Sequence, residues 1–385
     1  MNSLQKIDSM GQSIWLDFIS RKTIQDGTLQ KYIDEGVVGM TSNPAIFEKA
    51  MSGPDYDKEI GQLALEGKSK NDIYEELVVE DVQSASDLLR PVYNSTHGLD
   101  GYVSLEVSPT LARNTQGTIA EAKSYWGRLA RPNVMIKIPA TVEGVPAVSE
   151  TISNGTNVNV TLLFSVKRYE AIFDSYMKGL EMLAEKGGDI TKIRSVASFF
   201  LSRIDTMVDE DLEKIGTPEA LKLRGKTAIA CAKLAYELFE QKCASPRWQA
   251  LKSKGAHPQR LLWASTSTKN KAYSDVLYVD ALIAPETVNT LPQETITAYL
   301  DHGKPEIRIH NDLDQVKEVT GDLAKVGIDL TDIANRLEED GLKKFVDPYH
   351  KLEALLETKR KAAVESDSKD EKAVAQALAA SVAGL

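Results

Sequence analysis

The chain has 385 residues, of which 42% are hydrophobic, and this is enough apolar material for one large domain or two ordinary ones. Its formal net charge of -10 and pI of about 5.2 argue against a general nucleic-acid or membrane-surface binder, although a local basic pocket is compatible with them. No apolar stretch reaches the roughly 18–20 residues of a membrane span, and the amino-terminal segment lacks the pattern of a signal peptide.

The cysteines and histidines give no sign of a disulfide framework or a metal site. Cys231 and Cys243 form no CxxC pair, so a reducing cytoplasm is the expected compartment. The five histidines are scattered, and His302 and His310, the nearest two, match no metal-ligand spacing. We therefore expect no metal.

Short apolar runs alternate with amphipathic stretches along the chain. Eight runs are candidate strands, at residues 13–19, 36–43, 102–109, 133–139, 157–165, 193–202, 260–266 and 276–285. Helical patterns between them cover residues 112–130, residues 165–187 with Ser165 as the N-cap, and residues 217–242 with Thr217 as the N-cap and Pro218 in the first turn.

Eight strands that alternate with helices predict a parallel α/β fold, and the count fits a (β/α)8 TIM barrel with additional helices. A doubly wound sheet is the alternative, but neither GxGxxG after a strand nor GxxxxGK[ST] is present. Further helices are expected in residues 44–101 and 286–363. We expect a single barrel domain over residues 1–364, followed at 365–385 by a charged, then alanine-rich tail that forms a peripheral helix or frays.

The stretch "NVMIKIPAT", residues 133–141, places Lys137 inside an apolar run that Pro139 ends. An unpaired ammonium group in an apolar interior costs much free energy. Buried lysines therefore usually have a lowered pKa, which favours the neutral amine. Because alternate side chains of a strand share a face, Lys137 shares its face with Met135, and the aliphatic neighbours point the other way.

Five other candidate strands also carry polar residues on one face, mostly in their C-terminal halves. In a (β/α)8 barrel this face is the interior, and active sites form at its C-terminal mouth. The residues are Asp17, Thr41, Asn43, Ser104, Glu106, Asn159, Thr161 and Ser198, and Phe200 shares the face of Ser198. Thr41, Ser104 or Ser198 taken singly could be a satisfied core group, but Lys137, Glu106 and Asp17 are charged, and charges are seldom buried without partners or purpose.

Two interpretations of Lys137 are open. In the first, it forms a buried ion pair with Glu106 or Asp17, although such pairs often add little net stability. In the second, its amine attacks a carbonyl carbon to form a Schiff base, while Glu106 moves protons and Asp17 deprotonates a substrate hydroxyl as a carbon–carbon bond breaks. The iminium then serves as the electron sink, so neither a metal nor an organic cofactor is needed.

Several motifs of the chain resemble those of transaldolases of the longer bacterial type. They are "SIWLD", "GVVGMTSNPAIF", "SLEVSP", "MIKIPAT", "NVTLLFS", "SFFLSRID" and "WASTSTKN...YSD" within residues 13–275, and the later "LTDIANRLEEDGLKKF". The resemblance implies a (β/α)8 barrel that transfers a dihydroxyacetone unit from sedoheptulose 7-phosphate or fructose 6-phosphate to glyceraldehyde 3-phosphate or erythrose 4-phosphate. It implies a cytoplasmic enzyme of the pentose phosphate pathway, a monomer or homodimer, with sugar-phosphate substrates and neither nucleic-acid nor membrane partners.

The resemblance also assigns roles to residues. Lys137 is the Schiff-base lysine, Glu106 the proton shuttle acting through a water, and Asp17 the base on the hydroxyl of the fourth carbon. The expected substrate-binding residues are Thr41 and Phe200 at the site, Asn43 and Asn159 on the dihydroxyacetone unit, Thr161 on the catalytic water, and Ser198 and Arg203 near the phosphate.

The sequence departs from the family pattern after the seventh strand, where shorter transaldolases carry an arginine. The segment "STSTKNK" stands there, so Lys269 is the candidate phosphate ligand, and an exposed loop lysine is the alternative. Arg203 could instead pair locally with Asp205. Two rival functions are an aldolase of the same superfamily, in which a tyrosine tends to replace Phe200, and a sugar-phosphate-binding module without catalysis.

Overall fold

The computed structural model describes the backbone of residues 1–383 and the side chains of residues 1–369. Eight parallel strands close into a barrel in chain order, and β8 pairs with β1. The strands are β1 (Gln12–Leu16), β2 (Gly39–Thr41), β3 (Tyr102–Glu106), β4 (Val134–Pro139), β5 (Val158–Leu163), β6 (Ser195–Phe200), β7 (Gln259–Ala264) and β8 (Thr287–Leu291). This topology confirms the predicted (β/α)8 barrel and excludes the doubly wound sheet.

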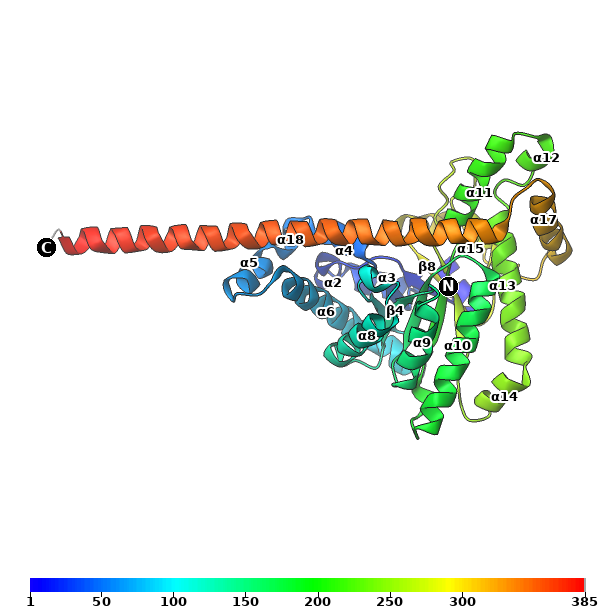
Figure 1. Cartoon of the computed structure of the whole chain (residues 1–385), viewed down its shortest axis with the longest axis horizontal. Coiled ribbons are helices and arrows are strands. Elements are labelled where there is room, and N and C mark those ends of the chain that lie inside the picture. The colour runs from blue at the N-terminus through cyan, green and yellow to red at the C-terminus, as the bar shows by residue number, and fades with distance from the viewer. Residues whose placement is uncertain (384–385) are drawn as a thin grey trace.

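Helices surround the barrel (Figure 1). Short 3-10 turns, labelled η, occur between some of them. In chain order they are α1 (Ser3–Ser9), α2 (Arg21–Gln25), α3 (Thr28–Glu35), α4 (Pro44–Met51), η1 (Pro54–Tyr56), α5 (Asp57–Leu65), α6 (Lys70–Leu88), α7 (Arg90–Ser95), η2 (Pro109–Leu111), α8 (Thr115–Leu129), α9 (Gly144–Ser153), α10 (Val166–Glu185), η3 (Ile190–Lys192), α11 (Ser202–Ile215), α12 (Pro218–Leu221), α13 (Thr227–Ala244), α14 (Pro246–Lys252), α15 (Leu277–Ala281), α16 (Gln293–His302), α17 (Leu313–Lys325) and α18 (Leu330–Ala383).

Seven of the eight predicted apolar runs overlap a barrel strand, but the eighth prediction is wrong. Residues 276–285 hold the helix α15, and β8 follows at Thr287–Leu291. An apolar run of this length has no periodicity that separates a buried strand from a buried helix. The chain enters β8 through Glu286, which has a positive φ of 54°.

The predicted helix over residues 217–242 is divided in the structure. Thr217 caps α12 as expected, but the chain turns before α13 at Gly225, which has a φ of +69°. A Cβ atom on Gly225 would come within 2.7 Å of the Tyr273 ring, so both the conformation and the space require glycine. Ser165, by contrast, caps α10 as predicted by accepting a hydrogen bond from the Arg168 backbone.

A polar network fills the amino-terminal end of the barrel. Arg260 on β7 forms an ion pair with Asp100 at 3.0 Å and donates to the Ser13 hydroxyl at 2.8 Å. The Trp15 indole nitrogen donates to the same Asp100 at 3.2 Å. A Cβ on Gly39 would lie 2.6 Å from the Trp15 ring, so β2 can pass the indole only with glycine there. The interior is thus filled below the mouth, as in other barrels of this kind.

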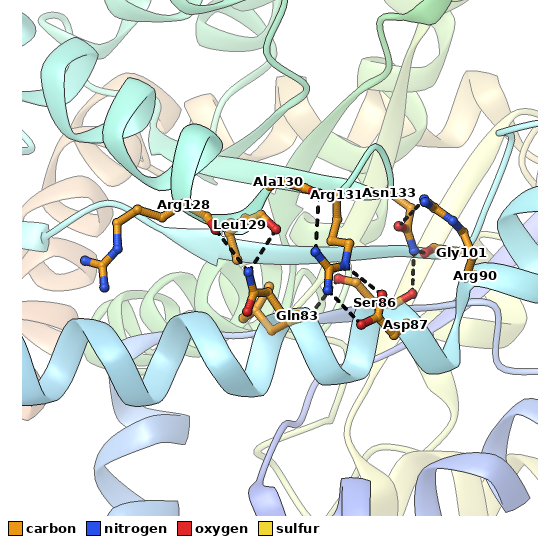
Figure 2. A network of polar contacts seen from close by, with 11 residues as sticks. Gln83, Ser86, Asp87, Arg90, Gly101, Arg128, Leu129, Ala130, Arg131 and Asn133 are labelled. Carbon is orange, nitrogen blue, oxygen red and sulfur yellow. Dashed lines mark hydrogen bonds and ion pairs between the residues drawn. The ribbon is translucent and has the colours of Figure 1, made fainter. Parts of the chain in front are cut away.

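The start of β4 is fixed by a network that joins it to α6 (Figure 2). The buried Asn133 amide donates at 2.8 Å to the carbonyls of Ser86 and Gly101 and accepts from Arg90 at 3.0 Å. Arg131, two residues earlier, forms a bidentate pair with Asp87 on α6. These bonds set the position of the strand that carries Lys137.

The long helix α18 crosses the carboxyl-terminal side of the barrel and continues beyond the body of the molecule (Figure 1). It packs against α4, α5, α6 and α11. Arg336 pairs with Asp211 on α11 at one end, and at the other end Lys359 donates to the carbonyls of Met51 and Gly53 at 2.9 Å. The helix is therefore held on both sides of the barrel mouth.

In the part of the chain that the structure describes, no helix combines the length and apolarity that a membrane span requires. Within the same part, no group of three or more His, Cys, Asp or Glu residues is arranged to hold a metal ion. Cys231 and Cys243 are both free thiols.

Candidate active site

A cavity of about 210 Å³ opens at the carboxyl ends of the strands. Most of the residues predicted for the site line it, namely Asp17, Thr41, Asn43, Lys137, Thr161, Ser198, Phe200, Arg203 and Lys269. The other two predicted residues, Glu106 and Asn159, are buried beside Lys137, on the strands that flank β4. The barrel thus brings the whole predicted set to one place.

Lys137 lies on β4 two residues before Pro139, which ends the strand. Only 4% of the Lys137 surface is exposed. Its Nζ donates to the Ser42 carbonyl at 2.9 Å and lies 3.2 Å from Glu106 Oε2. The buried ion pair that the sequence left open is therefore present. It does not exclude the nucleophile, because an amine that loses its proton to a neighbouring base can attack a carbonyl from the same position.

Glu106 stands opposite Lys137 in the β3–β4 register. Burial raises the pKa of its carboxyl group to about 6, and the nearby Lys137 charge opposes that shift. A carboxyl group with a pKa close to neutral can both release and take up a proton during one reaction cycle. Its position and chemistry suit a proton shuttle.

Asp17 follows β1 directly and lines the cavity. Its Oδ1 accepts a hydrogen bond of 2.8 Å from the Thr41 hydroxyl. Burial raises the pKa of Asp17, while the charge of Lys137 and the bond from Thr41 act against the shift. The carboxyl group is therefore a stronger base than an exposed aspartate.

Two amides and a hydroxyl line the wall around Lys137. Asn43 caps α4 with its side-chain oxygen, and its amide nitrogen is left for the cavity. The Asn159 amide donates to Ser104 at 3.1 Å and accepts from Ser198 at 2.7 Å. Thr161 Oγ1 is buried with no partner among the described residues.

The end of β5 is irregular next to Thr161. The register with β6 shifts between Val160 and Leu163, and Leu162 has a positive φ of 59°. A bulky residue in this conformation is strained, and a bulge of this kind redirects the side chains around it. Phe164, just beyond it, packs its ring 5.5 Å from that of Phe200 at the mouth.

Arg203 supplies the positive charge at the outer part of the cavity, from the first turn of α11. Its guanidinium lies 5.3 Å from the Phe200 ring and 5.7 Å from the Phe345 ring. Nη1 is buried with no hydrogen-bond partner among the described residues. The local pair with Asp205 does not form, because Asp205 accepts from the Ala228 backbone and the Tyr278 hydroxyl instead.

Lys269 is on the loop after β7 and lines the same cavity, but its side chain is exposed. Its Nζ donates to the Ser267 hydroxyl at 2.7 Å. Both interpretations of this residue, a phosphate ligand or a loop lysine, fit that geometry.

Eight cavity residues were not predicted from the sequence. Four of them lie at the end of β7 and on the loop before Lys269, namely Ala264, Ser265, Thr266 and Ser267. Thr290, Pro292 and Glu294 lie at the end of β8 and the start of α16, and they were missed because β8 was misplaced. Pro292, which follows "NTL", could have indicated the end of a strand there, as Pro139 does for β4. Phe345 comes from α18, about 200 positions after Lys137, and no local pattern indicates that contact.

A second, larger groove of about 690 Å³ lies outside the barrel, between α9, α10, α13 and the start of α18. Its lining is mainly aliphatic, and its Arg168 is paired with Glu338 on α18. Neither its size nor its lining points to catalysis, since another groove, beside α12 and α17, is larger still at about 850 Å³. The smaller cavity is the better candidate, because there a buried amine, that of Lys137, lies beside two carboxyl groups with raised pKa values.

A buried amine with two proton-transfer groups, at the carboxyl mouth of a (β/α)8 barrel, defines the class of barrel enzymes that form a Schiff base with a carbonyl substrate. Comparison with known proteins narrows the class. The family model described as "Transaldolase/Fructose-6-phosphate aldolase" matches residues 14–356. The chain belongs to this family.

Curated relatives that carry the name "Transaldolase" match over nearly the whole chain. The protein from Trichodesmium erythraeum is 50% identical over 94% of this chain and 98% of its own length. Those from Frankia alni and Thiobacillus denitrificans are 47% and 46% identical, each over 91% of this chain and over 95% and 99% of their own lengths.

Proposed function

We propose that this chain, a transaldolase, transfers a dihydroxyacetone unit between sugar phosphates through a Schiff base on Lys137. The donor is sedoheptulose 7-phosphate or fructose 6-phosphate, and the acceptor is glyceraldehyde 3-phosphate or erythrose 4-phosphate. The observation that carries the proposal is the convergence of Lys137, Glu106 and Asp17 at one cavity, in a chain that belongs to this family.

The covalent step begins on Lys137. Its neutral amine attacks the ketone carbon of the donor and forms a carbinolamine, which loses water to give an iminium ion. Glu106, 3.2 Å from Nζ, takes the proton from the amine and returns one to the departing hydroxyl through a water. The unpartnered Thr161 hydroxyl would hold that water.

Cleavage depends on Asp17. It takes the proton of the hydroxyl on the fourth carbon, and the electrons of the breaking carbon–carbon bond flow into the iminium. The product aldehyde leaves, and an enamine of dihydroxyacetone stays on Lys137. The enamine then attacks the carbonyl of the acceptor aldehyde, Asp17 returns the proton, and hydrolysis frees the new ketose. Because the iminium accepts the electrons, the cycle requires no cofactor.

The other cavity residues would hold the two ends of the substrate. We assign Thr41, Asn43 and Asn159 to the dihydroxyacetone end, and Ser198, Arg203 and Lys269 to the phosphate end. The Nη1 of Arg203, buried without a partner, supports the phosphate assignment, since a guanidinium can bind phosphate oxygens in a planar, bidentate way.

Release of free dihydroxyacetone, the aldolase reaction, is the second candidate function, and the family description includes it. Phe200 favours the transferase, because its ring carries no hydroxyl that could deliver a proton to the enamine. Loss of catalysis is disfavoured by the intact Lys137, Glu106 and Asp17. We place the enzyme in the cytoplasm and in the pentose phosphate pathway, as a monomer or homodimer without nucleic-acid or membrane partners.

Borohydride trapping tests the proposal. Reduction in the presence of fructose 6-phosphate should leave a dihydroxyacetone adduct on Lys137, located by peptide mass spectrometry. An adduct on Lys123 or another lysine would refute the assignment. Lys137→Arg should fold but be nearly inactive, because a guanidinium stays protonated and cannot act as the nucleophile.

A coupled assay with and without erythrose 4-phosphate or glyceraldehyde 3-phosphate separates the candidate functions. A transaldolase turns over the donor only when an acceptor aldehyde is present. Equal rates in both conditions would identify an aldolase, and binding without turnover would identify a module without catalysis.

A further inference from the structure

The cycle described above gives no role to the hydroxyl group of Thr290, although this group is linked to the base Asp17. Thr290, at the end of β8, lines the cavity and is 3% exposed. Its Oγ1 lies 2.7 Å from Thr41 Oγ1, and Thr41 Oγ1 in turn lies 2.8 Å from Asp17 Oδ1. The strands β8 and β2 flank β1, so the two threonines reach each other across the strand that leads to Asp17.

The direction of these two bonds follows from the number of protons. A hydroxyl group has one proton to donate, and an ionised carboxylate can only accept. Thr41 therefore donates its hydroxyl hydrogen to Asp17. In the hydrogen bond between the two threonines, Thr290 must be the donor and Thr41 the acceptor. The chain of donors runs from Thr290 through Thr41 to Asp17.

The backbone holds Thr290 in place for this bond. Its carbonyl accepts from the Thr266 hydroxyl at 3.0 Å, and its Cα is in register with Trp15 on β1. The backbone nitrogen of Asp17 donates to the next carbonyl, that of Leu291, at 2.8 Å. Thr290 and Asp17 are thus parts of one rigid strand pair.

Building on the proposed function, we propose that Thr290 is a positioning residue for the base Asp17. By donating a hydrogen bond to Thr41, Thr290 fixes the Thr41 hydroxyl as the donor to Asp17 Oδ1. Asp17 then presents its other oxygen, Oδ2, to the substrate hydroxyl. Hydrogen bonds in a chain polarise one another, so the donation from Thr290 also strengthens the bond to Asp17. That bond favours the ionised carboxylate, which is the form that acts as the base.

The other charges around Asp17 do not depend on Thr290. Lys137 on β4 and Arg203 on α11 favour the ionised form, whereas Glu106 on β3 and Glu294 on α16 oppose it. A change at Thr290 that leaves these four groups in place isolates the contribution of the hydroxyl chain.

Two substitutions separate the hydroxyl from the methyl group of Thr290. Thr290→Val keeps the shape and β-branching but cannot donate, and Thr290→Ser keeps the donor but loses the methyl group. If the hydroxyl matters, Val impairs the enzyme and Ser rescues it. If only packing matters, Thr290→Ser impairs the enzyme and Thr290→Val does not.

We expect Thr290→Val to lower kcat about 3- to 10-fold with little change in the KM for the donor. The acid limb of the pH profile of kcat should shift upward by about half a pH unit, because the ionised form of Asp17 loses part of its stabilisation. Thr290→Ser should stay within about twofold of the wild-type enzyme.

The trapped adduct gives the sharpest readout. Schiff-base formation with fructose 6-phosphate precedes the proton transfer to Asp17, so slower cleavage should raise the ratio of the intact six-carbon adduct to the three-carbon adduct on Lys137 in Thr290→Val. An unchanged ratio and kcat in Thr290→Val, or equal damage in Thr290→Ser, would overturn the inference. Absence of any adduct on wild-type Lys137 would overturn the proposed function itself, and the role of Thr290 with it.

Discussion

At the scale of single residues, the mouth of the barrel holds an unusual number of buried charges. Lys137 and Glu106 are each 4% exposed, and the guanidinium of Arg203 lies 5.3 Å from the Phe200 ring and 5.7 Å from the Phe345 ring. Removing such groups from water costs several kcal/mol per ion, and their mutual attraction often fails to offset it. A barrel stabilised by its aliphatic core gains little from them, so their presence is better explained by chemistry than by stability.

Arg203 and Lys269 can be compared directly. Arg203→Ala should raise the KM for phosphorylated substrates about 10- to 100-fold, because a charge-assisted hydrogen bond in a buried site is lost. Lys269→Ala should have a smaller effect of the same kind, since the side chain is exposed. Steady-state kinetics with donor and acceptor varied in turn will measure both.

The matched control is Lys271→Ala, an exposed lysine on the same loop that does not line the cavity. It should leave both KM values unchanged. If Lys269→Ala behaves like this control, Lys269 is a loop residue only.

Asp205 on α11 should make stability depend on pH. Burial raises the pKa of its carboxyl group to about 6, above the ordinary value of about 4. A carboxyl group whose pKa is raised on folding stabilises the protein below its unfolded pKa, and the contribution is lost as the pH rises through the folded value. The free energy of unfolding of the wild type, relative to Asp205→Asn, should therefore fall by about 2–3 kcal/mol between pH 4 and pH 7.

Urea unfolding of both proteins at the two pH values checks this expectation. Asp211 on the same helix is the control with the opposite sign, since the hydrogen bond that it accepts from Arg336 lowers its pKa. Its contribution is present above the unfolded pKa and is lost as the pH falls. A wild-type protein that gained stability relative to Asp205→Asn as the pH rose would contradict the assignment.

At the scale of elements, α18 is the part of the mouth that the barrel strands do not provide. Its Phe345 is 3% exposed, stands 5.9 Å from Lys137 Nζ, and also covers Arg203. Ion pairs and carbonyl contacts hold the helix on either side. An apolar ring at this position excludes water from the amine, and dry surroundings strengthen the electrostatic interactions within the site.

Phe345→Leu should therefore keep the fold but increase hydrolysis of the enamine. We expect acceptor-free release of dihydroxyacetone from fructose 6-phosphate to rise at least about twofold relative to transfer. The measurement is the ratio of the two rates. Phe199→Leu is the control, because Phe199 is on β6 but packs against Trp263 outside the cavity, so it loses similar packing without touching the site. Equal ratios in both variants would show that Phe345 does not shield the intermediate.

At the scale of the whole molecule, closure of the barrel is what assembles the site. Asp17 directly follows β1, Glu106 and Lys137 belong to β3 and β4, Arg203 lies at the start of α11, and Phe345 belongs to α18. Because the strands are parallel, their carboxyl ends meet at one rim, where α11 begins and where Phe345 of α18 lies close to Lys137. A cavity lined by residues from the whole chain requires the whole barrel to be folded.

Truncation tests where the functional unit ends. A chain that stops at residue 364 should keep its stability and activity, because the side chains at 365–369 are exposed and Lys359, which fastens α18, is retained. A chain that stops at residue 344 should lose activity with Phe345. Thermal unfolding and the coupled assay will show both effects, and a large loss of activity at 364 would extend the functional unit into the tail.

The sequence by itself determined most of the barrel and most of the candidate site. Strand alternation depends on local apolar periodicity, and polar residues on one face of successive strands must converge once parallel strands close. That is why Asp17, Lys137 and Thr161 could be assigned to one interior before any contact was known. The roles of these residues stay predictions.

Only the tertiary structure decided the rest. An apolar run does not reveal whether it is a helix or a strand, so α15 was mistaken for β8 and the hydroxyl of Thr290 was missed. The contact of Phe345 with the mouth depends on how α18 packs across the barrel, and packing between elements far apart in the chain leaves no local periodicity. Burial of Glu106, which sets its pKa, likewise exists only after the strands have closed around it.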